Sequence, residues 1–417
     1  SALIRKIDVK DTDYNTVFYF NIVISICLYI LLWICAPAIS RFFSESLLIP
    51  VIRVLGLVLI INSCSIIQRT VLVRNIDFKT QTKVSLIASL VSGGVGITMA
   101  LYHCGVWSLV GQQLSRQFFN SVLLWIYGKW RPLWEFSYKS FKDLFGFGSK
   151  LLLSGLIDVF YKNVYYIVIG RYYSATQLGQ YTRAEQFSTI FSSNLTSVVQ
   201  RVSYPVLSSI QEEPERLRDA YRKIIKVTML ITFALMFGLA AIAKPLIVIL
   251  IGEKWLMAVP FLQIICFSEM LYPLHAINLN ILQVRGYSGL FLKLEIVKKI
   301  IAVIPIMIGI FWGINYMLWG AVCISLVSYI LNSYYSGRLI DYSTVKQVKD
   351  IFPCFLVSSL VALLMWGITF LHFNFLVTLL LQVSVGILLA IVAYERMRLE
   401  EYKEIRRIIL SIIRKNS

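Results

Sequence analysis

Charged residues are scarce in this sequence. Asp, Glu, Lys and Arg together make up 15% of its 417 residues, whereas a soluble domain has about 25%. Hydrophobic residues make up 58%, and the mean hydropathy is +0.73. These values exclude an ordinary soluble domain. Apolar runs of membrane-spanning length, about 17 to 25 residues, recur from end to end, so we expect an all-α polytopic membrane protein.

Acidic residues are few relative to basic ones. The chain has 22 Asp and Glu against 40 Lys and Arg, a formal net charge of +18. In a soluble protein this excess would favour nucleic-acid binding. Here the basic residues lie in short loops between apolar runs, where they set the orientation in the membrane. We therefore expect no nucleic-acid partner.

Residue patterns for metal binding and catalysis are also lacking. The seven cysteines lie mainly in apolar segments without a C-x-x-C pair, which argues against disulfides and a metal site. There is no G-x-S-x-G, P-loop or metal-spaced His cluster, so the usual catalytic motifs are missing. We expect no enzyme activity, no cofactor and no metal.

Hydropathy predicts twelve membrane-spanning helices. Their approximate ranges are 17 to 36, 51 to 68, 82 to 102, 106 to 127, 148 to 170, 181 to 205, 223 to 243, 258 to 283, 290 to 312, 316 to 337, 351 to 371 and 374 to 394. Loops rich in Lys and Arg, such as the one with Arg69, Arg74 and Lys79, alternate with loops nearly free of them. By the positive-inside rule the basic loops are cytoplasmic, and so are both termini. The basic tail from Arg396 to Lys415 carries isoleucines at helical spacing and is expected to lie on the inner membrane surface.

Two parts of the chain repeat one another. APAISRFF and PVIRVLGLVLI, from residues 36 and 50, resemble KPLIVILI and PFLQIICFSEM, from residues 244 and 260. LVRNIDFKTQTKVSLI at 72 to 87 resembles QVRGYSGLFLKLEIVK at 283 to 298. The offset is about 210 residues throughout, the mark of an internal duplication. Two rocking halves around a shared central site are a transporter architecture.

The second copy starts near Gly146 with two helices, 148 to 170 and 181 to 205, whose first-copy equivalents would fall before residue 1. We expect about 60 residues, two helices, to precede Ser1, which gives fourteen helices in the intact protein: two six-helix lobes around a central cavity and a terminal pair. The predicted domains are an N-terminal lobe at 1–140 without its first two helices, a C-terminal lobe at 141–340, a helix pair at 341–394 and a basic amphipathic tail at 395–417.

The segment from 181 to 206 is far more polar than its neighbours. On a helix, Arg183 and Arg201 lie on one line about 27 Å apart, with Asn194 within about 20° of it. Beside this line fall Gln186, Thr189, Ser193, Thr196 and Gln200. The opposite arc holds Phe191, Leu195, Val198, Val199 and Val202, which predicts an amphipathic spanning helix with this arc toward lipid and one wet face. A charge at mid-membrane costs about 2.5 to 3.5 kcal/mol, so both arginines should face protein, water or a ligand. Two alternatives stay open: snorkelling of the arginines to the interfaces, and small polar residues that hold helices together.

Asp158 and Lys162 lie one turn apart near the middle of the preceding helix, where an ion pair forms easily. The pair is either a structural salt bridge or a charge cluster that contacts substrate or couples a proton or ion to transport. Arg53, Arg116 and Glu269 are further candidates on three other helices.

Pro273 should kink the helix that carries Glu269. A cavity lined by all these side chains would be net cationic and rich in hydroxyl, amide and tyrosine groups. It would suit phosphates and sugars better than an organic cation.

These segments resemble a known family. The resemblance is carried by IRVLGLVLIINSCSIIQRTVLVRNIDFKTQTKVSLIASLVSGGVG, GVWSLVGQQL, GRYYSATQLGQYTRAEQF, SYPVLSSIQ, GEKWLMAVPFLQIIC and PLHAINLNILQVRG, and it runs from residue 1 to about 390. The chain is similar to the Wzx-type polysaccharide flippases, particularly the WzxC-like branch of the multidrug/oligosaccharidyl-lipid/polysaccharide exporter superfamily. The resemblance implies a V-shaped two-lobe fold with a cationic central cavity. In members of this family, lobe-facing Arg, Lys and Asp residues are important. The resemblance implies that Arg183, Arg201, Asp158 and Lys162 correspond to them by position.

The resemblance also implies a function. Such a protein moves undecaprenyl-diphosphate-linked oligosaccharide repeat units across the bacterial cytoplasmic (inner) membrane for O-antigen, capsule or exopolysaccharide synthesis. The implied partners are the lipid-linked oligosaccharide and membrane lipids, with a polysaccharide polymerase and a chain-length regulator as further candidates.

Three alternatives remain from the residues alone. A drug exporter of the same superfamily would want buried acids in an apolar cavity. A membrane glycan polymerase or ligase would need a long outward loop with catalytic residues. A scaffold that does not transport has no distinguishing sequence feature.

Overall fold

The computed structural model describes residues 9–142 apart from 76, 129 and 139, residues 156, 159, 160 and 163–397, and residues 402 and 403. The regular structure of this part is helical, and no strand occurs in it. The chain divides into two compact units, residues 1–163 and 164–417. Each unit is described by itself.

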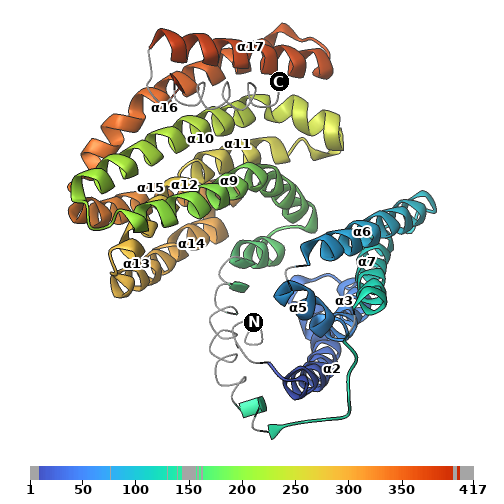
Figure 1. Cartoon of the computed structure of the whole chain (residues 1–417). Coiled ribbons are helices and arrows are strands. Elements are labelled where there is room, and N and C mark those ends of the chain that lie inside the picture. Colours follow the sequence, from blue (N-terminus) through green and yellow to red (C-terminus); the bar gives the residue numbers. More distant parts are fainter. Residues whose placement is uncertain are drawn as a thin grey trace, which may run out of the picture. The chain divides into compact units, whose positions relative to one another are not determined.

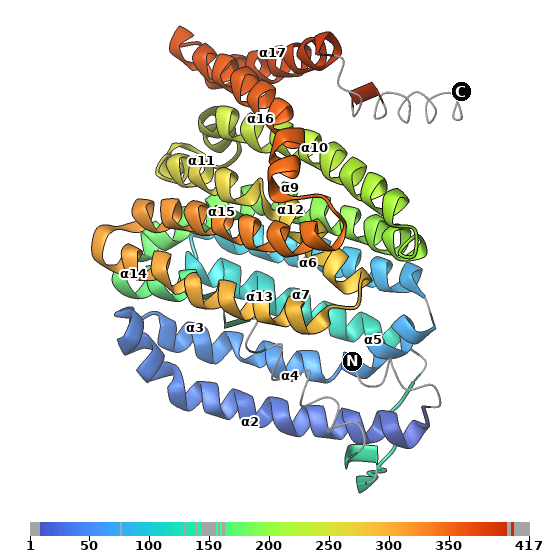
Figure 2. The same cartoon turned by 90° about the vertical axis from the view of Figure 1, so that its left-hand side faces the viewer.

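The helices of the first unit form a small antiparallel arrangement (Figures 1 and 2). They are α2 (Asp11–Phe43), α3 (Leu48–Leu55), α4 (Leu57–Ser63), α5 (Ile66–Arg74), α6 (Phe78–Leu101) and α7 (Val106–Tyr127). Helices α6 and α7 pack along each other, α2 packs against α3 and α4, and α4 contacts α7. Asp77 caps α6 by accepting hydrogen bonds from the Thr80 backbone N (3.0 Å) and the Thr80 hydroxyl (2.7 Å). These bonds hold the pKa of Asp77 below its ordinary value.

The predicted helix 51 to 68 is broken. One break is at Gly56, and a second separates α4 from α5, where the chain bends by 44°. A break inside a membrane is tolerated when its freed backbone groups find other partners. Here the Trp125 indole N–H of α7 donates to the Cys64 carbonyl at 2.9 Å. The neighbouring helix therefore stabilises the bend.

The second unit contains the remaining long helices. They are α9 (Ala175–Ser209), α10 (Pro214–Ile251), η1 (Glu253–Trp255), α11 (Ala258–Glu269), α12 (Tyr272–Val284), α13 (Ser288–Ile301), α14 (Val303–Trp312), α15 (Ile314–Leu339), α16 (Thr344–Gly367), η2 (Ile368–Leu371) and α17 (Phe375–Arg396), preceded by a helical stretch at 163–172. Helix α9 begins six residues before the predicted start because Ser174 and Gln177 form a capping box, a strong helix-start signal.

The break between α11 and α12 confirms the predicted kink at Pro273, which occupies the second position of α12. Ser325 of α15 donates its hydroxyl to the Ser268 carbonyl at 3.1 Å, and His275 Nε2 lies 3.1 Å from the same hydroxyl. As in the first unit, a neighbouring helix stabilises the interrupted backbone.

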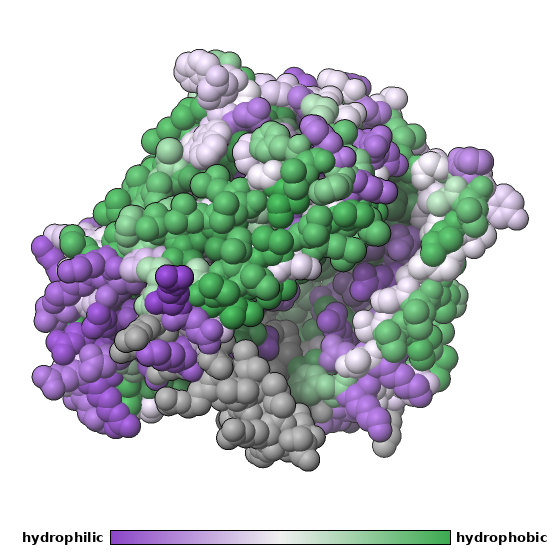
Figure 3. All heavy atoms as spheres, turned by 90° about the horizontal axis from the view of Figure 1, so that it is seen from above, coloured by the Kyte–Doolittle hydropathy of each residue, from purple (hydrophilic) through white to green (hydrophobic). Residues whose placement is uncertain are grey.

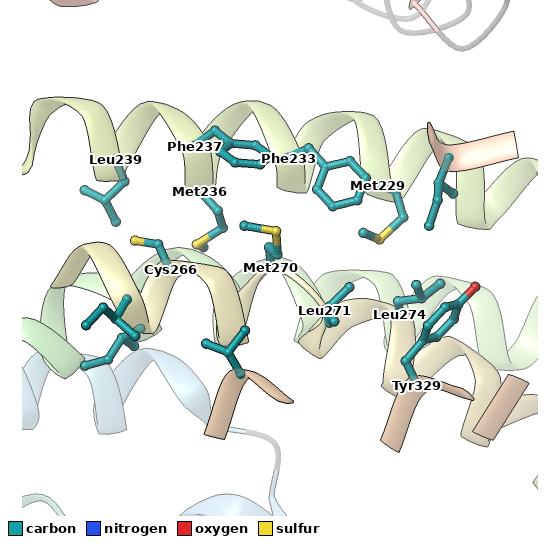
Figure 4. Packing of buried hydrophobic residues seen from close by; sticks show 14 of the residues in the cluster. Met229, Phe233, Met236, Phe237, Leu239, Cys266, Met270, Leu271, Leu274 and Tyr329 are labelled. Atoms are coloured by element: carbon teal, nitrogen blue, oxygen red, sulfur yellow. The ribbon is translucent and has the colours of Figure 1, made fainter. Parts of the chain in front are cut away.

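The core of the second unit lies between α10 and the α11–α12 pair. Figure 4 shows side chains of α10 directed toward those of α11 and α12. The labelled residues are Met229, Phe233, Met236, Phe237, Leu239, Cys266, Met270, Leu271, Leu274 and Tyr329. All of them are buried. Helix α10 also packs against α16, and α16 against α17, so the terminal helix pair is attached to the second unit.

Among the described helices, six are long and apolar enough to cross a membrane, or seven with the bent α3–α5 segment. They are α2, α6, α10, α15, α16 with η2, and α17. Many large apolar side chains on them are exposed, for example Ile34, Leu90 and Leu101 at 69%, 69% and 74%. Figure 3 shows a broad hydrophobic surface. Apolar area of this extent marks contact with lipid, so this is a multi-pass membrane protein.

Where the structure describes them, the other predicted spans are helical as well, but they are short, broken or polar. Helices α11 to α14 are short segments, and most of the predicted helix 148 to 170 lies outside the described residues. The repeat offset reappears in the helix boundaries: α6 and α13 begin at Phe78 and Ser288, and α5 and α12 end at Arg74 and Val284. The symmetry of the lobes, the count of fourteen helices and the domain boundaries stay predictions.

Candidate functional site: a polar pocket and two polar helices

Two long helices of the described chain, α7 and α9, are not among those apolar enough to span. Each carries a row of polar side chains as well as exposed apolar ones, for example Leu109 and Ile126 on α7. A helix of spanning length with a polar face must turn that face toward protein or water. Both helices are therefore the place to look for a binding site.

The polar row of α7 faces a pocket within the first unit. This polar pocket has a volume of about 590 Å³ and lies among α4, α5, α6 and α7. Its lining residues are Asn62, Ser65, Arg69, Gln81, Thr82, Val84, Ser85, Leu86, Ser89, Gln113, Arg116, Gln117, Asn120 and Leu124. Five side-chain amides, four hydroxyls and two guanidinium groups thus surround one space.

The charge of this pocket is one-sided. Among the described residues, its lining contains Arg69 and Arg116 and no acidic residue. Neither arginine forms an ion pair or a hydrogen bond with the residues that the structure describes, and both side chains are exposed. Gln117 Nε2 donates to Asn62 Oδ1 at 3.0 Å and joins α7 to α4. Two free guanidinium groups among amides and hydroxyls make a site for anionic and hydroxylated ligands.

Arg116 was among the predicted candidates, and the pocket places it beside a residue that the sequence reasoning missed. Arg69 looked like one of the cytoplasmic loop cations, but it lies in α5 and lines the pocket. The sequence did contain a signal for the polar face of α7. Gln113, Arg116, Gln117 and Asn120 occur at i, i+3, i+4 and i+7, so they share one face of a helix.

The predicted helix at 181 to 205 is confirmed as α9. Its predicted line is exposed: Arg183, Asn194 and Arg201 all lie on the open side. The Arg183 guanidinium carbon lies 5.5 Å from the centre of the Trp255 ring, and its Nη1 donates to Gln186 Oε1 at 2.8 Å. Arg201 has no ion pair or hydrogen bond with described residues.

The opposite side of α9 differs from the prediction. Phe191, Val198 and Val202, expected to face lipid, are exposed. Between residues 188 and 203, however, the buried residues are all small and polar: Ser188, Ser192, Thr196 and Ser203. They pack against α11 and α12, because small side chains allow close helix approach. Thr196 was expected beside the wet line and is instead 4% exposed. Packing between helices therefore accounts for part of the polarity of this helix.

The other described candidates are not among the residues that line the polar pocket. Arg53 on α3 places its guanidinium carbon 4.5 Å from the Trp33 ring centre. Glu269 ends α11, and its carboxylate accepts a hydrogen bond from the Ser192 hydroxyl of α9. Asp158 and Lys162 lie outside the described residues. Of the predicted residues that the structure describes, Arg116 is the one that lines this pocket.

The helices and the lipid-facing surface define an all-α polytopic membrane protein. The chain matches the family described as "Polysaccharide biosynthesis protein" over residues 1–260. That is more than half of its length, and the chain belongs to this family.

Two relatives within reach of sequence comparison make the similarity more specific. It is similar to the teichuronic acid biosynthesis protein TuaB of Bacillus subtilis, with 25% identity over 93% of this chain and 81% of TuaB. It is also similar to the lipopolysaccharide biosynthesis protein WzxC of Escherichia coli, with 22% identity over 74% of this chain and 63% of WzxC. These matches confirm the WzxC-like resemblance read from the sequence.

A solved structure resembles the fold. The lipid II flippase MurJ, in an inward closed conformation, aligns with a TM-score of 0.73 and 14% sequence identity. The alignment covers 95% of this chain and 87% of MurJ. The all-α polytopic fold predicted from the sequence is confirmed.

Proposed function

We propose that this protein is a flippase that moves lipid-linked oligosaccharide repeat units across the bacterial cytoplasmic membrane. The observation that carries the proposal is the acid-free polar pocket with its two unpaired arginines. The names of the similar proteins support it, since MurJ is a lipid II flippase and TuaB and WzxC serve polysaccharide biosynthesis. The proposal covers the substrate class and leaves the sugar unit open.

The chemistry of the pocket suits such a substrate. A diphosphate carries oxygens that arginine binds in pairs of parallel hydrogen bonds. Sugars offer hydroxyl groups that amides and serines bind in either direction. A transporter must also release its cargo, so several moderate contacts serve better than one tight clamp. Arg69 and Arg116 meet that need, because they are exposed and have no protein partner among the described residues. Neither has to break an ion pair within the protein when substrate binds, and neither forms one when substrate leaves.

The exposed line of α9 extends the same chemistry in the second unit. Arg183, Asn194 and Arg201 are open side chains on a helix that is too polar to face lipid along its whole length. We expect them to contact the sugars or the diphosphate during transport. The polyprenyl chain has no polar atoms beyond its head and stays in lipid.

Location and partners follow from the same reasoning. The basic loops favour a cytoplasmic-membrane protein with both termini in the cytoplasm. A polysaccharide polymerase and a chain-length regulator are the partners expected to act on the product. We propose no catalytic step for this chain.

The test is export of the polysaccharide in a strain that lacks the gene and carries full-length variants. Arg69→Ala with Arg116→Ala should abolish surface polysaccharide at normal protein level and leave the lipid-linked unit inside the cell. Lys83→Ala is the matched control. It removes a cation from α6 that lies 5.0 Å from the Tyr127 ring and does not line the pocket. Wild-type surface polysaccharide in the double variant would refute the site.

A drug exporter is the second candidate. Glu185 and Glu269 of the second unit have no cationic partner among the described residues, and such an exporter could use them to bind cations. Deletion would then increase drug sensitivity while surface polysaccharide stays normal.

A further inference from the structure

The turn that joins α10 to α11 is bonded to the first part of α9. It begins at Gly252, whose φ of +94° favours glycine, and it contains the short helix η1 (Glu253–Trp255). Gln180 Nε2 of α9 donates to the Lys254 carbonyl at 2.8 Å, and the Gln180 side chain is buried. This bond fixes the backbone immediately before Trp255. The turn and α9 both belong to the second unit.

The Trp255 ring lies against α9 at two positions one helical turn apart. A Cβ placed on Gly179 would lie 3.7 Å from Trp255 Cζ3, so the ring lies where the helix has no side chain. Four residues farther along, the guanidinium carbon of Arg183 lies 5.5 Å from the ring centre. Residues four apart are neighbours on one face of a helix, and a guanidinium within about 6 Å of a tryptophan ring forms a cation–π contact.

The two arginines of the exposed line of α9 differ in how they are held. The Arg183 guanidinium contacts the Trp255 ring, and its Nη1 donates to Gln186 Oε1 at 2.8 Å. Its side chain is nevertheless exposed, so its remaining N–H groups are open to a ligand. Arg201 has no partner among the described residues. The protein therefore fixes one guanidinium of this line in advance and leaves the other to reorient.

We propose that Trp255 is a positioning residue, which holds the Arg183 guanidinium ready for the anionic head group of the substrate. The inference rests on the proposed function, because it concerns how Arg183 takes part in binding. Immobilising a long side chain costs affinity when a ligand binds. A ring that orders Arg183 beforehand removes part of that cost, and Trp255 does this without touching the substrate.

A purely structural role is the alternative for Trp255. The ring is half-buried and packs against the hydrophobic core of the second unit. Loss of the ring could then weaken binding by disturbing the fold, with or without Arg183. A positioning role acts only through Arg183, so the two roles differ in a double-mutant cycle.

The cycle measures binding of farnesyl diphosphate, a diphosphate on a short isoprenoid, to the detergent-purified full chain. The cost of ordering one long side chain predicts that Trp255→Leu binds about two- to twelvefold more weakly. In the Arg183→Ala background the same change should have no further effect, because the side chain that Trp255 positions is absent. Further weakening in that background would overturn the proposal, since Trp255 would then support the fold alone.

Two more variants complete the set. Trp255→Phe keeps an aromatic ring, so it should recover part of the affinity lost in Trp255→Leu and guards against poor folding of that variant; affinity no better than that of Trp255→Leu would count against a cation–π contact. Trp312→Leu is the matched control. Trp312 is an exposed tryptophan at the end of α14 with Phe311 as its aromatic neighbour, and its replacement should leave the affinity unchanged.

A second measurement reports on the ring itself. The full chain is labelled with 5-fluorotryptophan, and the ¹⁹F resonance of Trp255 is identified by its loss in Trp255→Phe. Addition of farnesyl diphosphate should shift this resonance, because the phosphates offset the positive charge beside the ring. The shift should be absent in Arg183→Ala, and the Trp312 resonance should stay in place. A Trp255 resonance that does not respond to the probe in the wild type would overturn the proposal.

Failure of this inference differs from failure of the proposed function. Unchanged affinity in Trp255→Leu, with affinity lost in Arg69→Ala plus Arg116→Ala, would refute the positioning role and leave the proposed function standing. No binding of farnesyl diphosphate by the folded wild type would refute the proposed binding of a diphosphate, and the positioning role with it.

Discussion

The arginines of the polar pocket allow a quantitative prediction. Arg69 and Arg116 have no protein partner among the described residues, so replacing either one should cost the fold little. Each one that binds a phosphate group contributes a charge-assisted hydrogen bond worth about 1.5 to 3 kcal/mol. At 1.4 kcal/mol per tenfold change, each Arg→Ala variant should bind about 10- to 150-fold more weakly.

Farnesyl diphosphate is a suitable probe, because it carries the diphosphate on a short isoprenoid. Binding to the detergent-purified full chain is measured by thermophoresis for the wild type, Arg69→Ala, Arg116→Ala and the double variant. Arg116→Lys should lose less than Arg116→Ala, since Lys keeps the charge but not the planar fork. Affinity should also fall as salt screens the charges.

The controls separate binding from folding. Farnesol lacks the diphosphate and should bind all variants equally, and Lys83→Ala should behave like the wild type. The reasoning would be refuted by unchanged affinity in the double variant. It would also fail if the melting temperature fell in step with affinity, because the arginines would then be structural.

Three further predictions concern packing and are checked by thermal unfolding of the purified protein. A Cβ at Gly337 would lie 2.6 Å from the Tyr342 carbonyl, so Gly337→Ala should lower the free energy of unfolding by about 1 to 3 kcal/mol; Gly238→Ala, with open space around its Cβ, should be neutral or raise it by up to about 1 kcal/mol. Asp350 accepts hydrogen bonds from Arg222 Nη2 (2.7 Å) and the Tyr342 hydroxyl (2.6 Å), and Asp350→Asn should lower stability by about 1 kcal/mol. Ser325→Ala leaves the Ser268 carbonyl without its added donor and should cost about 1 to 2 kcal/mol. Ser359→Ala should cost less, because Ser359 is a half-buried serine whose hydroxyl donates to the Leu356 carbonyl of its own helix, α16.

Hydropathy was sufficient to predict most helices, because lipid demands long apolar runs and satisfied backbone groups. Helix α7 spans the predicted residues 106 to 127 as Val106–Tyr127, and the kink at Pro273 was found from a missing backbone donor. The break between α4 and α5 was not predicted from the sequence. It depends on Trp125, which is 61 residues away in sequence and bonds to the Cys64 carbonyl. Local sequence does not contain that contact.

The candidate site was predicted in part. Arg116 was recognised as a cation within an apolar segment, whereas Arg69 was assigned to a loop because it follows the predicted span 51 to 68. The pocket forms because α5 and α7 pack so that both polar faces meet. That meeting depends on tertiary packing, which a single helix projection cannot supply.

The face of α9 shows the same limit. Periodicity correctly predicted that Arg183 and Arg201 share an exposed line, but it could not decide what Ser188 and Ser192 face. Small polar residues serve equally in a wet lumen and in close helix contacts. Ser188 and Ser192 are buried where α9 packs against α11 and α12, so they serve in close helix contacts. Ser192 also donates a hydrogen bond to the Glu269 carboxylate of α11.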